Sequence, residues 1–262
     1  QLFLDAQESG GQFRPIFGDI RASDTLVEAC KGVDFVFHLA ALKHVPLCEA
    51  NPVEAVRTNI LGIKNLIDAA RSHGVEKVLN TSTDKVVNPF NVMGTSKLMG
   101  EQLIRAANLA EPDTRFFSTR FGNVLGSRGS VVPFFKKILE EGSKRLPITH
   151  LDMTRFWITL RQGVDFVLEN FERMHGGEIF VPKIPSIRIT DLAKALSPDS
   201  TLEIVGIRPG EKLHEIMCPS DDSHLTIEFK SHYVIKPSIR FLDENDFLLD
   251  KKKEKGTLVQ QG

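Results

Sequence analysis

The sequence has only three cysteines, Cys30, Cys48 and Cys218, and they lie far apart along the chain. None forms a Cys-x-x-Cys pair or shares a zinc-ligand spacing with a histidine. This argues against a disulfide framework and against a zinc site, and we expect no bound metal. Scattered cysteines are typical of proteins in a reducing cytoplasm, where we place this one.

Long hydrophobic runs and an excess of one charge are also missing. No apolar stretch approaches the roughly 18 residues of a membrane-spanning helix, so we expect no membrane insertion. The formal net charge of −1 gives no global electrostatic reason to bind nucleic acid. An anionic ligand must therefore be held by local groups. No signal peptide is recognisable, and because the chain begins at Gln1 rather than Met, we expect further sequence upstream.

What the sequence does contain is an alternation of strand and helix patterns. Apolar, β-prone runs occur at 33–40, 77–83 and 116–124, and apolar residues at helical spacing predict helices over 52–73 and about 91–109. Such alternation predicts a doubly wound α/β fold with a parallel sheet. The first run is almost continuously apolar, which predicts a strand buried on both faces.

The chain changes character near residue 125. We expect a nucleotide-binding domain over 1–125, in which 1–25 form the end of a helix, a short strand at 13–20 and a polar turn. A smaller, partly interleaved α/β domain for substrate would cover 126–240. A charged tail would cover 241–262, and its charge run DKKKEK, from Asp250, is expected to be a solvated surface segment.

Groups able to do chemistry gather between residues 82 and 101. Thr83, Asp84 and Lys85 follow the second predicted strand, at the end where open α/β sheets place ligands. Met93 and Lys97 are four residues apart, so they would share one face of the next helix. A hydroxyl, a carboxylate and two ammonium groups should therefore converge on one crevice. By contrast, we interpret His38, inside the first apolar run, as a core residue.

This layout resembles the active site of the extended short-chain dehydrogenase/reductase superfamily, where Ser or Thr follows a strand and Tyr-x-x-x-Lys follows on a helix. The Thr-Asp-Lys triplet is similar to that of its soluble, C5-inverting UDP-N-acetylglucosamine 4,6-dehydratases. The segments RFGNVLGSRGS at 120–130 and GIRPGEK at 206–212 support the resemblance, which covers about 13–237. One departure is Met93, which stands where the family has Tyr; the sequence has a single tyrosine, Tyr233.

The resemblance implies a Rossmann-like domain with NADP or NAD bound tightly and regenerated in every turnover. Along this cofactor it places Asp19, Ile20, Ala40, Ala41 and Lys97. Such a domain normally opens with a strand, a Gly-rich turn and a helix that holds the pyrophosphate. No Gly-rich run of this kind occurs near the start. We therefore expect one βα unit and the following strand, with the residues that separate NAD from NADP, to lie upstream.

The resemblance also implies roles in an internal redox dehydration. Hydride leaves C4 of the sugar, the C5 proton is removed, water is lost from C6, and the hydride returns to C6. Asp84 is the implied acid at O6 and Lys85 the implied base at C5, while Thr83 would position the C4 hydroxyl. Lys97 would bind the nicotinamide ribose. Met93 has no ionisable proton and should pack against substrate or nicotinamide, which leaves Lys97, Lys85 or an ordered water to replace the tyrosine.

The UDP-sugar substrate is assigned by the same resemblance to Lys43, Asn123, Arg155, Arg208 and Glu211. Arginine offers a planar fork of donors for phosphate, and glutamate can accept hydrogen bonds from ribose hydroxyls. The resemblance further implies a homo-oligomer, either a dimer or a hexamer.

Three functions stay open. An inverting dehydratase is favoured because the triplet supplies both an acid and a base. A nucleotide-sugar 4-epimerase would need hydride transfer but no such pair. A non-catalytic nucleotide-sugar-binding protein would fit Met93 and the missing Gly-rich turn.

Overall fold

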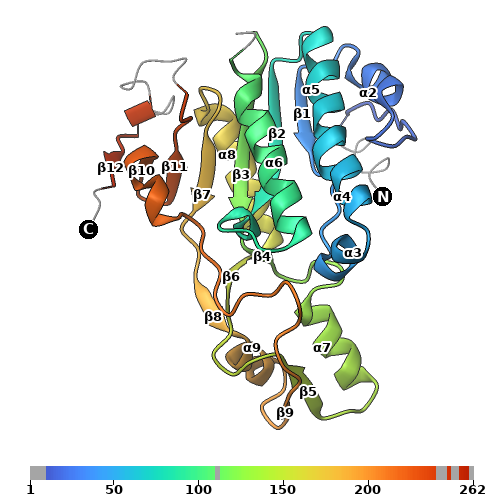
Figure 1. The fold of residues 1–262 in the computed structure, drawn as a ribbon, viewed down its shortest axis with the longest axis vertical. Helices are drawn as coiled ribbons and strands as arrows, with labels where there is room; N and C mark the ends of the chain where they lie inside the picture. Colours follow the sequence, from blue (N-terminus) through green and yellow to red (C-terminus); the bar gives the residue numbers. More distant parts are fainter. Residues whose placement is uncertain (1–9, 110–112, 240–246, 249–253, 260–262) are drawn as a thin grey trace.

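The structure, a computed structural model, describes residues 10–109, 113–239, 247–248 and 254–259. The molecule is elongated and has two parts (Figure 1). A large sheet with helices on both faces forms the upper part of Figure 1, and a smaller group of short strands and two helices forms the lower part. No helix among the described residues is both long enough and apolar enough to cross a membrane.

The large sheet has seven strands in the order β1-β2-β3-β7-β11-β10-β12. Their bounds are β1 Phe35–His38, β2 Lys77–Thr83, β3 Arg115–Phe121, β7 Ile179–Pro182, β10 Thr226–Glu228, β11 His232–Ile235 and β12 Thr257–Leu258. The first four strands in the order run parallel, and the other three join in antiparallel pairs. β2 and β3 pair from Lys77↔Arg115 to Thr83↔Phe121, so their carboxyl ends are level. The predicted parallel sheet is confirmed, with an antiparallel extension at one side.

Helices cover both faces of this sheet. They are α2 (Ser23–Cys30), α3 (Val45–Ala50), α4 (Pro52–Val56), which continues through the π-helical turn η1 (Arg57–Leu61) into α5 (Gly62–Ser72), then α6 (Val92–Ala107) and α8 (Leu160–Arg173). Val78 and Phe116 pack with α5 and α6 on one face, whereas Leu79 and Phe117 pack with α8 on the other. Neighbouring residues of a strand point to opposite faces, so this alternation explains why both faces are apolar. The fold is doubly wound.

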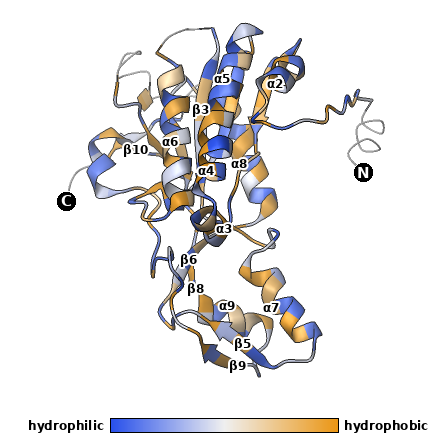
Figure 2. Cartoon of the chain, turned by 45° about the vertical axis from the view of Figure 1, so that its right-hand side comes forward, coloured by the Kyte–Doolittle hydropathy of each residue, from blue (hydrophilic) through white to orange (hydrophobic). Residues whose placement is uncertain are grey.

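Two predictions near the start of the chain are wrong. Residues 10–19 form no strand, and in Figure 2 this stretch runs out from the body of the molecule, with Phe17 completely exposed. Residues 1–9, where a helix end is predicted, lie outside the described part. β1 is not buried on both faces: Phe35 and Phe37 are 47% and 43% exposed. Within the described chain β1 is an edge strand that pairs with β2 alone, which accounts for its exposed side chains.

The lower part is built from β4 (Asn123–Val124), β5 (Arg145–Ile148), β6 (Thr154–Ile158), β8 (Ser186–Arg188), β9 (Thr201–Ile204), α7 (Val131–Glu140) and α9 (Ile189–Leu196). β4, β6 and β8 form one small sheet, and β5 pairs with β9 in another. Phe135, Leu146, Ile148 and Trp157 fill a separate core between them and the two helices. The chain then returns to the large sheet, so segments after residue 125 belong to both parts.

Described parts of the tail pack against the large sheet. Phe247 is 6% exposed and packs into the core beside α8, and β12 pairs with β10. Most of the charged run that begins at Asp250 lies outside the described residues. Apolar residues on either side of that run explain why the described parts of the tail return to the sheet.

Candidate active site

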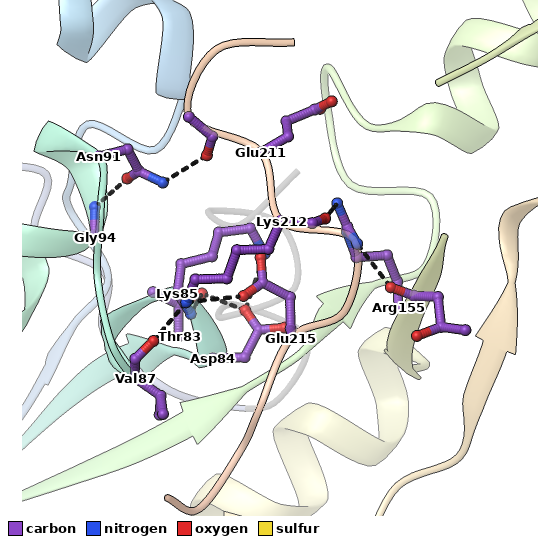
Figure 3. A network of polar contacts seen from close by, with 12 residues as sticks. Thr83, Asp84, Lys85, Val87, Asn91, Gly94, Arg155, Glu211, Lys212 and Glu215 are labelled. Carbon is purple, nitrogen blue, oxygen red and sulfur yellow. Dashed lines mark hydrogen bonds and ion pairs between the residues drawn. The ribbon is translucent and has the colours of Figure 1, made fainter. Parts of the chain in front are cut away.

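The carboxyl end of β2 carries the predicted triplet. β2 turns directly into a 3-10 turn, η2 (Asp84–Val86), which Thr83 caps by accepting a hydrogen bond from the Lys85 backbone N–H at 3.4 Å. Asp84 is fully buried, and its Oδ1 accepts from Thr83 Oγ1 and from Lys85 Nζ, both at 2.9 Å (Figure 3). Asp84 Oδ2 has no hydrogen-bond partner among the described residues. The structure therefore brings the three groups together and leaves one buried acceptor atom unused.

The start of α6 is held close to this turn. Asn91 caps the helix by accepting from the Gly94 N–H at 2.7 Å, and its Nδ2 donates to the Gly210 carbonyl oxygen at 2.8 Å. A Cβ on Gly94 would collide with the carbonyl oxygen of Lys85. Glycine is therefore required where the first turn of α6 meets the triplet.

Lys97 lies on α6 beneath the end of β2. Its side chain is buried, and Nζ donates to the Thr81 carbonyl oxygen at 2.6 Å. Burial lowers the pKa of Lys97 to about 8, and the nearby Glu101 carboxylate partly offsets this effect. Burial, together with the Lys97 charge, lowers the pKa of His38 to about 4. His38 is 5% exposed, as predicted for a core residue, although its Nε2 has no partner in the described part.

Met93 also lies on α6, four residues before Lys97. It is 3% exposed and packs against Cys48, Ala55 and Val45 of the helices beside α6. The chain itself therefore occupies most of the Met93 surface. Contact of Met93 with a ligand stays a prediction.

Two charged residues that the sequence reasoning missed complete the site. Glu215 Oε1 lies 3.9 Å from Lys85 Nζ, and Glu215 Oε2 lies 3.5 Å from Lys212 Nζ. Lys212 also donates to the Val87 carbonyl oxygen at 2.5 Å (Figure 3). Burial raises the pKa of Glu215, against the opposing effect of the Lys85 charge. Lys212 is the last residue of the GIRPGEK segment and Glu215 comes three residues later, but no spacing rule predicts which charged side chains of this region turn toward η2.

The five predicted substrate residues have different surroundings. Arg155 is buried, and its guanidinium donates to the carbonyl oxygens of Thr154, Lys212 and Leu213 at 2.7–3.2 Å. Arg208 and Glu211 form an ion pair at 2.7 Å. Lys43 Nζ donates to the Arg128 carbonyl oxygen at 2.8 Å, and Asn123 Oδ1 is buried without a partner in the described chain. Arg155 thus anchors the segment that carries Glu215, while substrate contact by any of the five stays a prediction.

Apart from Lys97, the predicted cofactor residues lie on the β1 side. Asp19 forms an ion pair with Arg21 at 2.5 Å, and hydrogen bonds from Arg21 lower the pKa of Asp19 to about 2. Ile20 packs over Gly62 of α5. Ala40 and Ala41 follow β1, whose last residue, His38, pairs with Asn80 of β2, so both alanines lie at the same sheet edge as the triplet.

The described residues contain no group of three or more histidine, cysteine or acidic side chains placed to hold a metal ion.

Comparison with known proteins decides the family. The sequence profile of the family described as "Polysaccharide biosynthesis protein" matches residues 4–237. The chain belongs to this family. The UDP-N-acetylglucosamine 4,6-dehydratase (inverting) of Campylobacter jejuni subsp. jejuni serotype O:2 is 58% identical over 252 residues, which cover 95% of this chain and 75% of the relative. The UDP-glucose 4-epimerase of Rickettsia massiliae is 44% identical over 243 residues, covering 90% and 71%.

Solved structures agree with this family assignment. The structure of Pen from Bacillus thuringiensis superposes with a TM-score of 0.88 at 35% identity and covers all of this chain and 78% of that one. DesIV, a dTDP-glucose 4,6-dehydratase from Streptomyces venezuelae, gives a TM-score of 0.71 at 23% identity, covering 86% and 74%. At that identity it shows the fold alone. The predicted resemblance to nucleotide-sugar dehydratases and the Rossmann-like fold are confirmed.

Proposed function

We propose that this chain is a UDP-N-acetylglucosamine 4,6-dehydratase that inverts C5 and works with a bound nicotinamide cofactor. The observation that carries the proposal is the Asp84–Lys85 pair, a fully buried carboxylate 2.9 Å from an ammonium group at the carboxyl end of a parallel strand. The 58% identical relative from Campylobacter jejuni carries the same activity in its name.

The residues present fit the nicotinamide end of such a cofactor. Lys97 supplies a buried positive charge beneath the sheet edge, and Ala40 and Ala41 have no bulky side chains that would keep a flat ring away. We assign Asp19 and Ile20 to the same ligand. When bound, NAD or NADP would accept the C4 hydride and return it to C6.

Asp84 and Lys85 supply the proton transfers of the elimination. A proton must first move from Lys85 to Asp84 within the ion pair. With C4 oxidised to a ketone, the C5 proton becomes acidic, and the resulting Lys85 amine takes it. Protonated Asp84 gives its proton to the 6-hydroxyl, which leaves as water. Lys85 is then an ammonium group and Asp84 a carboxylate, as in the ion pair with 2.9 Å between Nζ and Oδ1. After the hydride has returned to C6, C5 takes a proton from solvent on the opposite face of the ring, which inverts its configuration. General acid and base steps of this kind each contribute about 10²–10⁴ in rate.

Proton removal from the C4 hydroxyl requires another group, because Met93 has no ionisable proton. Thr83 can orient that hydroxyl, and Lys97, with a pKa of about 8, is neutral often enough near physiological pH to accept the proton directly or through a water. We therefore assign to Lys97 the part that tyrosine takes elsewhere in the superfamily.

The substrate is proposed to contact Lys43, Asn123, Arg155, Arg208 and Glu211. We further propose that the protein is cytoplasmic, which its three free cysteines support. A homo-oligomer, a dimer or a hexamer, is proposed from the family resemblance.

The test is incubation of the full-length protein with UDP-N-acetylglucosamine in deuterated water, followed by NMR. We expect a 6-deoxy-4-keto sugar with deuterium at C5 and inverted configuration there. Unchanged substrate from protein with demonstrated cofactor binding would contradict the proposal.

A 4-epimerase is the second candidate, because the Rickettsia relatives are named UDP-glucose 4-epimerase. Epimerisation moves a hydride at C4 and needs no acid and base for C5 and C6. The same NMR experiment separates the two: an epimerase would return a 4-epimer that keeps its C6 hydroxyl and carries no deuterium at C5.

A further inference from the structure

Residues 208–215, here called the crossing segment, link the two parts of the molecule over the active site. The upper part binds it twice: Asn91 donates to the Gly210 carbonyl oxygen at 2.8 Å, and Lys212 of the segment donates to the Val87 carbonyl oxygen at 2.5 Å. From the lower part, Arg155 on β6 donates to the carbonyl oxygens of Lys212 and Leu213. The crossing segment therefore has a fixed position relative to both parts.

Glu215 ends this segment with a buried carboxylate. Its side chain is only 4% exposed, and its Oε2 lacks a hydrogen-bond partner in the described chain. Burying a carboxylate without full hydrogen bonding is unfavourable unless nearby charges compensate. Lys85 at 3.9 Å and Lys212 at 3.5 Å provide that compensation. The result is a row of alternating charges, Asp84, Lys85, Glu215 and Lys212.

Among these four residues, Lys85 has a side chain whose orientation must be fixed by its neighbours. Its ammonium group has three donors and no acceptor, and it ends a flexible four-carbon stem. Asp84, its neighbour in sequence, fixes one donor at 2.9 Å. Glu215 attracts the same nitrogen from a different element, so two carboxylates hold Nζ between them (Figure 3).

We propose that Glu215 is a positioning residue that orients the Lys85 nitrogen toward C5 of the sugar and stabilises the positive charge that forms there. The inference rests on the proposed dehydratase function. Charge develops on Lys85 when it takes the C5 proton, and a preorganised carboxylate acts on that charge without reorganising. Because Glu215 lies on the crossing segment, which also carries Arg208 and Glu211, the position of the base depends on the loop proposed to bind the nucleotide.

The test compares Glu215→Gln with wild type in the deuterated-water assay. The amide keeps the shape of the side chain and removes its charge. We expect kcat to fall on the order of 10- to 100-fold with KM changed less than about threefold, since a small misplacement of a reacting group has effects of this size. Deuterium entry at C5 should fall in parallel with product formation. Glu215→Asp, which keeps the charge, should recover part of the rate.

Glu203→Gln is the matched control, because Glu203 is an exposed carboxylate on β9, away from the triplet. It should turn over like wild type. A Glu215→Gln variant that matches wild type in kcat and in deuterium entry overturns the inference, as does a loss confined to KM. If wild type itself converts no UDP-N-acetylglucosamine, the proposed function fails first. Equal melting temperatures for the two glutamine variants would show that the rate loss is not unfolding.

Discussion

Two charged networks begin at successive residues of β2 and differ in how completely they are satisfied. At Ser82, the hydroxyl donates to Glu101 Oε2 at 2.5 Å, and Glu101 Oε1 pairs with Arg120 at 2.6 Å. Arg120 also donates to the Met217 carbonyl oxygen at 2.8 Å. Both oxygens of this buried carboxylate are used, although Arg120 Nε lacks a hydrogen-bond partner among the described residues, and both charged side chains are at most 4% exposed.

The network at Thr83 is incomplete by comparison. Asp84 Oδ2 and Glu215 Oε2 are buried and lack hydrogen-bond partners among the described residues, and the Lys85 side chain is 23% exposed. A closed network stabilises the fold, whereas an open one has atoms free for a substrate. Both networks join a hydroxyl, a carboxylate and a cation, so satisfaction of the carboxylate oxygens and exposure of the cation, not charge, distinguish the pair we interpret as structural from the pair we propose as catalytic.

The largest effect on activity is expected from Lys85→Arg, which removes the proposed base of the Thr83 network but keeps its positive charge. Arg in Lys85→Arg can still pair with Asp84 but cannot be deprotonated in a protein. We expect turnover of UDP-N-acetylglucosamine to fall about 10²–10⁴-fold, with urea unfolding little changed. Steady-state kinetics and urea titration check this. Retained dehydration would remove Lys85 from the role of base, and retained C4 epimerisation would favour the epimerase.

The closed network should respond in the opposite way. Arg120→Met leaves the buried Glu101 carboxylate without its partner, which typically costs about 3–5 kcal/mol of stability. Urea unfolding should show that loss, and kcat of the molecules that remain folded should stay within a few-fold of wild type. If Arg120→Met lost activity without losing stability, the division into a structural and a catalytic network would be wrong.

Strands β1, β2 and β3 of the large sheet and the triplet could be predicted from sequence, because they depend on local patterns. Apolar runs at 77–83 and 116–124 gave β2 and β3, and Thr83, Asp84 and Lys85 follow directly from the end of β2. The roles of Glu215 and Lys212 depend on how a segment about 130 residues later crosses the sheet edge. The exposure of β1 depends on which strand lies beside it. Neither the roles of Glu215 and Lys212 nor the exposure of β1 can be predicted from the spacing of nearby residues.

Lys97 lies between the networks and predicts a pH dependence of stability. Its pKa is about 8 in the folded protein against 10.5 for an ordinary lysine. From pH 8 to 10.5 the unfolded chain holds the proton and the folded one does not, so the free energy of unfolding rises with pH. Lys97→Met lacks this contribution. The stability of wild type relative to Lys97→Met should therefore increase by up to about 3 kcal/mol over this window.

Urea unfolding of both proteins at several pH values between 7 and 10.5 measures that difference. Residues that titrate equally in wild type and Lys97→Met cancel in the comparison. If the stability difference between wild type and Lys97→Met did not change between pH 8 and 10.5, the pKa of Lys97 would not be lowered in the folded protein. Lys97 could then not accept a proton near neutral pH.

The smallest effect is expected at Met93, which touches neither network. Leu in Met93→Leu has nearly the same volume, and swaps of this kind within a core usually cost less than about 1.5 kcal/mol. Because Met93 is buried against Cys48 and Ala55 and transfers no proton, kcat should stay within a few-fold of wild type. Kinetics together with urea unfolding measure both quantities. A large loss of kcat at unchanged stability would instead place the Met93 thioether against the reacting groups, as an extension of the open network along α6.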